Sequence, residues 1–252
     1  MLDQDDWRIL LQDFSSAECS IQVTTYFETS ASFSRPARVL CSDGSEFWIK
    51  RSQVGRPIFV EQVVGAIGRR IGAPVPEIKI VFLDGALIQA EPGLSHFTSG
   101  YVHASKREME CTDRDTFRYQ DEPANRSRFA ALAVLYTWSG ATDHQFIYKK
   151  QSPHLVFSVD HGHFFHGTGW TEASLPSVAP IRSLDSSFSG VKLTPAEIAP
   201  VLNAVEGLTI LDIASAVARS PGTWSVTTAE RIAVCMLLER RRGELLALRG
   251  KI

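Results

Sequence analysis

The sequence predicts an α+β protein with two lobes: a β-rich N-terminal lobe that contains one helix, and a mainly helical C-terminal lobe. Apolar β-type runs separated by turn sequences fill most of residues 20–91, and apolar residues at helical spacing dominate from residue 123 onward. We therefore assign residues 1–91 to the N-terminal lobe and residues 92–252 to the C-terminal lobe of a single domain.

The N-terminal lobe is expected to hold about five strands. Ser42-Asp43-Gly44-Ser45 and Asp84-Gly85 are turn sequences, so each is expected to join the two strands of a hairpin. The helix carries valine and isoleucine at helical spacing and stops at Gly72. The predicted elements are a strand at 20–29, a hairpin over 37–51, a helix over 57–72 and a second hairpin formed by 77–83 and 86–90.

The C-terminal lobe is expected to consist of helices around one inserted hairpin. Thr194 followed by Pro195 and Glu197 is a helix start, with threonine as N-cap and glutamate at the third helical position. The predicted elements are an irregular segment at 94–122, a helix over 123–139, a hairpin within 144–161, a loop at 167–190 and a last helix from 227 or 228 to 248. Together with the first lobe, this is the layout of protein-kinase-like folds.

The composition argues against several classes of function. The 252 residues carry a net charge of -2, so a basic surface for nucleic acid is not expected, and Arg240–Arg242 is the one concentrated basic run. The acidic N-terminus lacks the features of a signal peptide, and no apolar stretch is long enough to span a membrane. Four scattered cysteines do not suggest a disulfide framework. We expect a cytoplasmic protein without a nucleic-acid partner or a membrane span.

Lys50 and Glu61 are the first candidate pair of functional residues. Lys50 ends an apolar strand, and Glu61 lies eleven residues later, early in the predicted helix. In a kinase-type site, a strand lysine holds the α- and β-phosphates of ATP and a helix glutamate pairs with it. The alternative is a surface lysine and an exposed helix glutamate, which are common in proteins.

Asp143 and Asp160 flank the predicted hairpin of the second lobe. Asp143 follows the apolar helix, where a catalytic base could take the proton of an acceptor hydroxyl, although aspartate is also common in turns. Asp160 ends the second β-type run and is followed by Gly162. This Asp-x-Gly arrangement suits a carboxylate that holds Mg²⁺ against phosphates.

Three histidines, His161, His163 and His166, follow Asp160 closely. A zinc site in a metal-dependent hydrolase, built from these histidines with Asp143 and Asp160, is therefore a competing interpretation. Because Asp160 already supplies a hard oxygen ligand, we favour histidines that lie in loops near a metal-phosphate site.

From about residue 36 to residue 249, the sequence resembles the HipA-like kinases. In that family, the glutamate-bearing helix ends in a Leu/Ile-Gly-x-Pro-x-Pro phrase, matched here by Ile71-Gly72-Ala73-Pro74-Val75-Pro76. The Lys50 strand precedes this phrase, and the Asp143 loop and Asp160-His161-Gly162 follow it in the family's order. Residues 223–250, with a tryptophan and an Arg-Arg pair before x-x-Leu-Leu, look like the family's closing helix.

The resemblance implies a two-lobed kinase that binds ATP and Mg²⁺ and phosphorylates a serine or threonine of an unidentified protein substrate. It implies that Lys50 contacts the ATP phosphates and acts in catalysis, and that Glu61 pairs with Lys50. Asp143 would be the catalytic base and Asp160 the metal ligand. The adenine is expected against the backbone where the lobes are predicted to join, at Ile88, Gln89, Ala90 and Glu91.

Two features depart from the family pattern. Tyr148 stands where the family usually carries the asparagine that binds the second metal, and Gln145 is the nearest amide that could replace it as a metal ligand. The loop that would cover the phosphates, between Thr25 and Arg35, offers serine and threonine in place of glycine. A pseudokinase, which binds nucleotide but acts as a regulator or scaffold, is therefore the alternative function.

Overall fold

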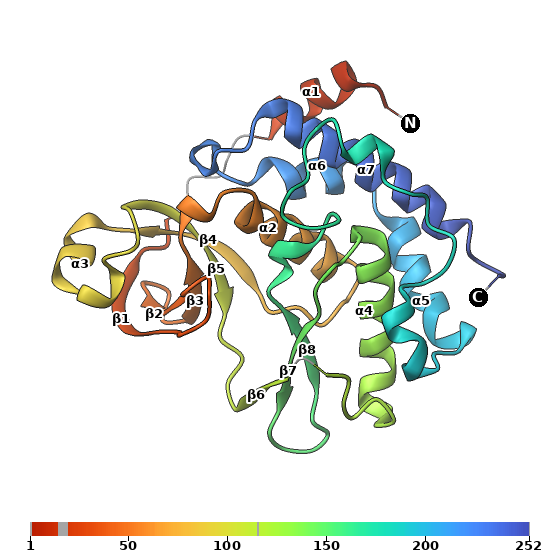
Figure 1. Cartoon of the computed structure of the whole chain (residues 1–252), viewed down its shortest axis with the longest axis horizontal. Helices are drawn as coiled ribbons and strands as arrows, with labels where there is room; N and C mark the ends of the chain where they lie inside the picture. Colours follow the sequence, from red (N-terminus) through yellow and green to blue (C-terminus); the bar gives the residue numbers. More distant parts are fainter. Residues whose placement is uncertain (1, 15–19, 115, 252) are drawn as a thin grey trace.

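The computed structural model describes residues 2–14, 20–114 and 116–251. A five-stranded antiparallel sheet forms one end of the molecule, and a group of helices forms the other (Figure 1). The predicted α+β architecture, with a β-rich N-terminal part and a helical C-terminal part, is confirmed. The strands of this sheet, in spatial order, are β1 (Val23–Thr29), β2 (Ala37–Cys41), β3 (Glu46–Lys50), β5 (Gly100–Lys106) and β4 (Ile78–Leu83).

Strand β3 shows how the sheet separates a small apolar core from a second face. Its side chains alternate, so Phe47 and Ile49 are buried in the core, whereas Trp48 and Lys50 lie on the opposite face. The register of the sheet pairs Lys50 with His103 of β5. The alternating pattern of this strand therefore determines on which face Lys50 lies.

The prediction of a second hairpin is wrong, because its expected second strand is a helix. Residues 86–90 belong to the short helix α3 (Gly85–Ala90). The Asp84 carboxylate caps this helix by accepting a hydrogen bond of 2.7 Å from the backbone N–H of Ala86. The Asp-Gly sequence thus starts a helix instead of a hairpin turn, because an aspartate can cap a helix as readily as it can form a turn.

The chain also passes between the two lobes later than predicted. The strand that pairs with β4 is β5, which lies in the segment that we expected to be irregular. The chain leaves the sheet after Lys106, not at residue 91, and residues 107–110 lead it into a second, three-stranded sheet. The strands of the second sheet are β6 (Cys111–Arg114), β7 (Gln145–Lys149) and β8 (Val156–Val159), of which β7 and β8 form the predicted hairpin.

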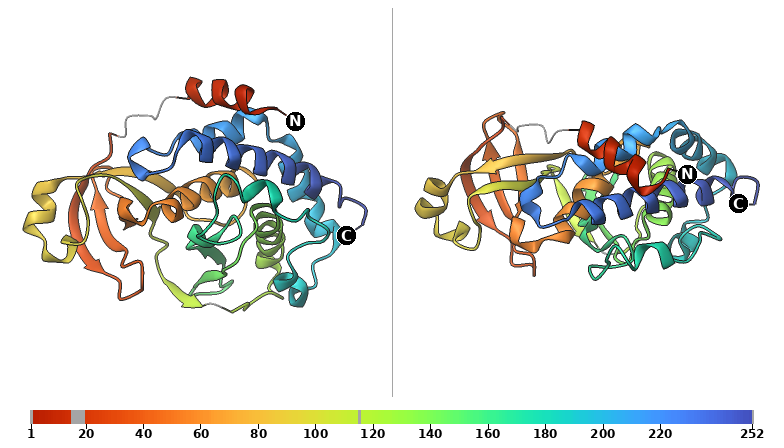
Figure 2. Two further views of the ribbon diagram at one scale, coloured as in Figure 1. Left: turned by 45° about the horizontal axis from the view of Figure 1, so that its top comes forward. Right: turned by 90° about the horizontal axis from the view of Figure 1, so that it is seen from above.

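Helix α2 (Arg56–Arg70) is the helix predicted for the N-terminal lobe, yet it is embedded in the helical lobe. Its buried apolar residues belong to the large core of the helical lobe and not to the small core of the sheet. Both views of Figure 2 show α2, in orange, beside the blue C-terminal helices. The position of α2 is therefore set by the helical lobe.

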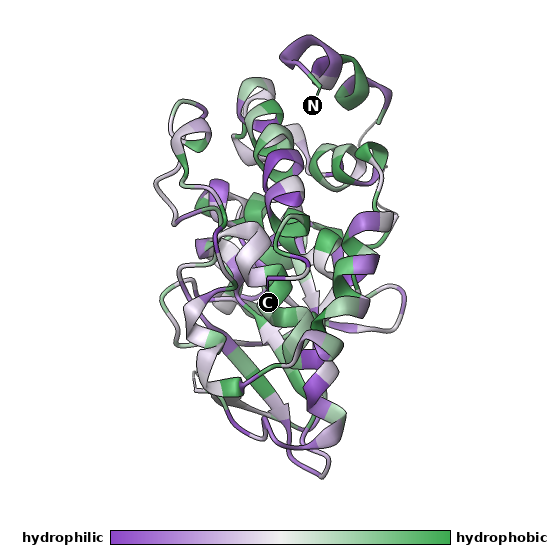
Figure 3. Cartoon of the chain, turned by 90° about the vertical axis from the view of Figure 1, so that its right-hand side faces the viewer, coloured by the Kyte–Doolittle hydropathy of each residue, from purple (hydrophilic) through white to green (hydrophobic). Residues whose placement is uncertain are grey.

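The helical lobe also includes the first helix of the chain. Helix α1 (Gln4–Asp13) packs against α6 and α7 and buries Trp7 and Leu11, so it lies outside the N-terminal lobe to which we had assigned it. Figure 3 shows both hydrophobic and hydrophilic residues on the first helix, which lies beside the label N. The remaining long helices are α4 (Pro123–Ser139), α5 (Pro195–Gly207), α6 (Ile210–Ala218) and α7 (Thr228–Leu246).

Within the described residues, no single helix is long and apolar enough to cross a membrane. Helices α5 and α6 reach the required length and composition only when taken together, and the chain bends by 80° between them.

Arginines of α7 cap the carboxyl ends of three other helices. The last carbonyl groups of a helix lack donors within the helix and carry the negative end of its dipole. The contacts run from Arg231 to the Val217 carbonyl of α6 (3.0 Å), from Arg241 to the Thr137 and Trp138 carbonyls of α4 (2.6 and 2.7 Å), and from Arg242 to the Val205 and Glu206 carbonyls of α5 (3.0 and 2.6 Å). Two residues of the basic run at 240–242 are therefore helix caps.

We expect Arg241→Met to lower the free energy of unfolding by about 2–3 kcal/mol, because the buried carbonyls of Thr137 and Trp138 lose their charged donor. Urea denaturation measures this change. Arg249→Met is the control, since it removes only exposed contacts, an ion pair with Glu206 and a hydrogen bond to Asn203, and should cost less than about 0.5 kcal/mol. Equal losses in the two variants would contradict a capping role for Arg241.

Candidate active site

Three chain segments bring Lys50, Glu61 and Asp160 into one group, called here the ion-pair group. Lys50 ends β3, Glu61 lies in the second turn of α2, and Asp160 directly follows β8. The Lys50 Nζ donates to Glu61 Oε1 and also to Asp160 Oδ1, the latter at 2.6 Å. The side chains of Lys50 and Glu61 are 11% and 5% exposed. The alternative of an exposed lysine and an exposed glutamate is therefore wrong.

The charges of the ion-pair group do not balance. Burial alone lowers the pKa of Lys50, but the two carboxylates outweigh burial and raise that pKa. Burial raises the pKa of Glu61, but Lys50 and His103 outweigh it and bring the pKa well below its usual range. The pKa of Asp160 is raised because burial, together with the charge of Glu61, outweighs the attraction of Lys50. Two carboxylates thus share one ammonium group, and an additional cation beside Asp160 would be stabilised.

The turn after Asp160 approaches α2 closely. The Asp160 backbone is left-handed, with φ 60°, and Gly162 lies against the first turns of α2. A Cβ atom at Gly162 would lie 3.1 Å from Pro57 Cβ and 3.3 Å from Glu61 Oε1. Glycine at this position therefore allows the turn to bring Asp160 within reach of Lys50.

Asp143 lies in the loop between α4 and β7, at the same end of the hairpin as Asp160. Its carboxylate accepts a hydrogen bond from the backbone N–H of His144 (2.8 Å). The neighbouring Thr142 Oγ1 donates to the carbonyl oxygen of His163 (2.5 Å), which joins this loop to the turn after Asp160. Among the described residues, no direct hydrogen bond or ion pair connects Asp143 to the ion-pair group.

Gln145 lies between the two aspartates. It begins β7 and is paired in register with Val159, the residue directly before Asp160. Its Nε2 lies 3.4 Å from Asp143 Oδ2. Tyr148, by contrast, is fully buried in the large core. The hairpin register therefore brings Gln145 next to Asp160, whereas Tyr148 is a core residue.

The segment predicted to contact adenine lies elsewhere. Helix α3 and the residue after it, Glu91, lie at the outer end of the N-terminal sheet, away from the helical lobe (Figures 1 and 2). The prediction that Ile88, Gln89, Ala90 and Glu91 lie where the lobes join is therefore wrong. The connection between the two sheets is residues 107–110, because β5 returns across the N-terminal sheet before the chain leaves it.

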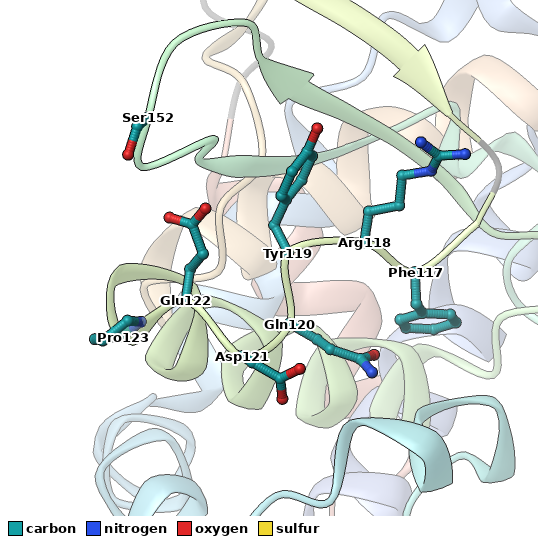
Figure 4. A pocket seen from close by; sticks show the side chains of 8 residues that line it. All are labelled: Phe117, Arg118, Tyr119, Gln120, Asp121, Glu122, Pro123 and Ser152. Carbon is teal, nitrogen blue, oxygen red and sulfur yellow. The ribbon is translucent and has the colours of Figure 1, made fainter.

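A hollow of about 590 Å³ lies between residues 117–123 and Ser152 (Figure 4). Ser152 is in the turn of the β7–β8 hairpin, at the opposite end from Asp143 and Asp160. A strand as long as β7 spans about 17 Å. The hollow is thus separate from the ion-pair group.

The histidines are not arranged as a zinc site. His161 is buried, and its Nε2 lies 2.8 Å from Ser158 Oγ. In the part of the chain that the structure describes, no group of three or more His, Cys, Asp and Glu side chains is arranged to hold a metal ion. The hydrolase interpretation therefore lacks its donor set, whereas Mg²⁺ needs only one or two carboxylates in addition to phosphates.

Two contacts of the site were not predicted from the sequence. His103 lies 3.3 Å from Glu61 Oε2 through its Nε2 and 2.9 Å from Gln62 Oε1 through its Nδ1. The sequence predicts an irregular segment where the structure has β5, and it therefore gives no signal for this contact. The second contact is between His144 Nε2 and Ser187 Oγ (2.8 Å), which ties the Asp143 loop to the long loop at 167–190.

The burial of His161 has a consequence for stability. Burial lowers its pKa to about 4, whereas an unfolded histidine has a pKa of about 6.5. Between these two values the unfolded state binds the additional proton, so the free energy of unfolding falls as the pH drops from 6.5 towards 4. We expect this residue to cost about 2 kcal/mol of stability near pH 5 relative to neutral pH.

His161→Asn provides the comparison, because asparagine does not titrate. Urea denaturation near neutral pH and near pH 5 should show a smaller loss of stability for this variant than for the unchanged protein. The same pH dependence in both proteins would contradict the buried, neutral state of His161.

A family model described as HipA-like kinase matches residues 23–164, a range that includes the ion-pair group and Asp143. The crystal structure of the proinflammatory kinase CtkA from Helicobacter pylori is similar in fold, with a TM-score of 0.58 over 92% of this chain and 95% of that chain at 10% sequence identity. No match was found among curated proteins. Because the family match covers more than half of the sequence, we conclude that this chain belongs to the HipA-like kinase family.

Proposed function

We propose that this chain is an ATP- and Mg²⁺-dependent phosphotransferase that transfers the γ-phosphate of ATP to a serine or threonine hydroxyl of a protein. The observation that carries the proposal is the ion-pair group, in which one buried lysine is shared by a helix glutamate and an aspartate at the end of a strand. Kinases use such a lysine and such an aspartate to position the phosphates and the metal. Burying these charges is costly, so their presence favours a functional role.

Each residue has a separate role in this proposal. Lys50 would bind the α- and β-phosphates, and Glu61 would hold Lys50 in the required orientation. Asp143 would orient the acceptor hydroxyl and accept its proton. Because Asp143 stands apart from the ion-pair group, it is available to a hydroxyl instead of being neutralised by Lys50.

The residues around Asp160 fit a divalent cation. The carboxylate is a hard oxygen ligand, and the charge of Glu61 beside it favours an additional positive charge. The Gln145 amide nitrogen is the atom that contacts Asp143, so the amide oxygen could serve as a second ligand. A bound cation would supply charge neutralisation on the phosphates.

We place the nucleotide base between β3 and the β7–β8 hairpin, beside residues 107–110. Trp48 shares a face of β3 with Lys50 and is only partly buried. On the hairpin, Ile147 and Phe157 are paired in register and lie on the face opposite to the buried Phe146. These apolar side chains could enclose a flat base next to the lysine that binds its phosphates.

Purified protein with Mg²⁺ and γ-labelled ATP should transfer label to itself or to proteins of a cell lysate. Asp160→Asn and Asp143→Asn should each reduce the transfer by about 100-fold or more, because the first loses the metal ligand and the second loses the base. Asp121→Asn, in the separate hollow of Figure 4, is the matched control and should transfer label normally.

The same assay separates the alternatives. Transfer that persists in Asp160→Asn would contradict the proposed roles. An absence of transfer, while ATP still raises the melting temperature, would identify a pseudokinase, the function that the buried Tyr148 favours. The absence of both label transfer and ATP binding would overturn the proposal.

ATP should change the tryptophan fluorescence of the protein, because Trp48 lies on the same face of β3 as Lys50. The other four tryptophans, Trp7, Trp138, Trp170 and Trp224, are buried and should not respond. A titration with ATP should show a saturable change that is lost in Trp48→Leu. A change that is retained in this variant would exclude Trp48 from the base site.

A further inference from the structure

His103 is a buried polar residue inside the candidate site, and its side chain is 1% exposed. It lies on β5 directly beside Lys50 of β3. Its Nε2 lies 3.3 Å from Glu61 Oε2, and its Nδ1 lies 2.9 Å from Gln62 Oε1. The two oxygens of the Glu61 carboxylate therefore have different partners, because Oε1 accepts a hydrogen bond from Lys50.

The chemistry of these partners determines where His103 carries a proton. A carboxylate only accepts hydrogen bonds, so the contact with Glu61 is attractive only if Nε2 bears a hydrogen. Gln62 is compatible with this arrangement in either charge state of the ring. Its amide oxygen can accept a hydrogen bond from Nδ1 of an imidazolium, and its NH₂ group, after a half-turn of the amide, can donate to Nδ1 of a neutral ring.

We propose that His103 is a positioning residue of the ATP site, whose Nε2–H donates to Glu61 Oε2 and thereby holds the carboxylate with Oε1 towards Lys50. The inference rests on the proposed function only in naming ATP. The 3.3 Å contact on which it rests is present in the protein without nucleotide, and His103 Nε2 has no hydrogen-bond partner among the described residues that would compete with Glu61.

The need for such a residue follows from the sharing of Lys50. Asp160 competes with Glu61 for the same ammonium group, and Glu61 is almost entirely buried. Without His103, Glu61 Oε2 would have no donor among the described residues. The carboxylate could then turn away from Lys50, which would be held by Asp160 alone. Lys50 and Asp160 would in that case neutralise each other instead of binding phosphate and metal.

The first test needs no nucleotide. Nuclear magnetic resonance of protein labelled with ¹⁵N in its histidine rings reports which ring nitrogens carry hydrogen. The His103 signals are assigned as those missing from His103→Gln. We expect Nε2 to be protonated near neutral pH, as the neutral ring or as the imidazolium. An Nε2 without a proton would overturn the proposal even if the protein binds ATP.

The second test compares two substitutions of the same residue. His103→Gln retains an NH₂ donor near the position of Nε2, whereas His103→Leu fills the space without a donor. We expect ATP affinity, measured by titration calorimetry, and label transfer to fall by about 10-fold or more in His103→Leu, and to stay within about threefold of the unchanged protein in His103→Gln. His154→Phe is the control, since His154 stacks on Tyr119 near the turn of the hairpin.

The outcomes are distinguishable. Equal losses in His103→Gln and His103→Leu, or a similar fall in their melting temperatures with no difference in ATP affinity, would show that His103 contributes packing only and would overturn the proposal. If the unchanged protein binds no ATP, the proposed function fails, and the ring-nitrogen measurement still decides whether His103 donates to Glu61.

Discussion

The burial of α2 in the core of the helical lobe is the constraint on which the candidate site depends. Glu61 projects from this helix towards Lys50 of the N-terminal sheet, so the contact between them joins the two lobes. Arg56, at the start of α2, forms an ion pair with Glu230 of α7, and Gly162 lets the turn after Asp160 pack on the same end of the helix. Some kinases are regulated by moving the equivalent helix. Here such a movement would expose the apolar residues of α2 to water, which favours a permanently assembled lysine–glutamate pair.

Burying the charges of the ion-pair group costs free energy, and this cost indicates that the group has a function. Charges removed from water must be paired and hydrogen-bonded, and an apolar replacement is often at least as stable. In this protein, one ammonium serves two carboxylates, and burial together with the charge of Glu61 raises the pKa of Asp160. Glu61 is supported from a second direction by His103. A site with surplus negative charge beside a buried lysine fits a ligand that combines a divalent cation with phosphates, because that ligand supplies charges of both signs.

Arginine side chains of α7 hold the ends of the helices that surround the Asp143 loop. Arg231, Arg241 and Arg242 project from α7 and donate to carbonyl groups at the ends of three neighbouring helices. One of these ends, that of α4, leads directly into the loop that carries Asp143, so Arg241 anchors the start of that loop. Arg241 is 5% exposed, and its guanidinium group donates to backbone carbonyls. The basic run at 240–242 is consequently not an exposed patch for an anionic partner.

The sequence by itself determined the elements with a strong local signal: helical spacing over 57–72, the turn at 42–45, and the hairpin between the two aspartates. It therefore pointed to Lys50, Glu61 and Asp160, which lie at the ends or on the faces of those elements. Local signals failed at 86–90, where Asp-Gly can start either a turn or a helix, and at 100–106, which is a strand because it pairs with both of its neighbours in the sheet. Only the tertiary structure decided that α1 and α2 pack in the helical lobe, and that Lys50 meets an aspartate 110 residues away. The physical reason is that periodicity and turn chemistry act over a few residues, whereas these contacts depend on which apolar faces cover one another.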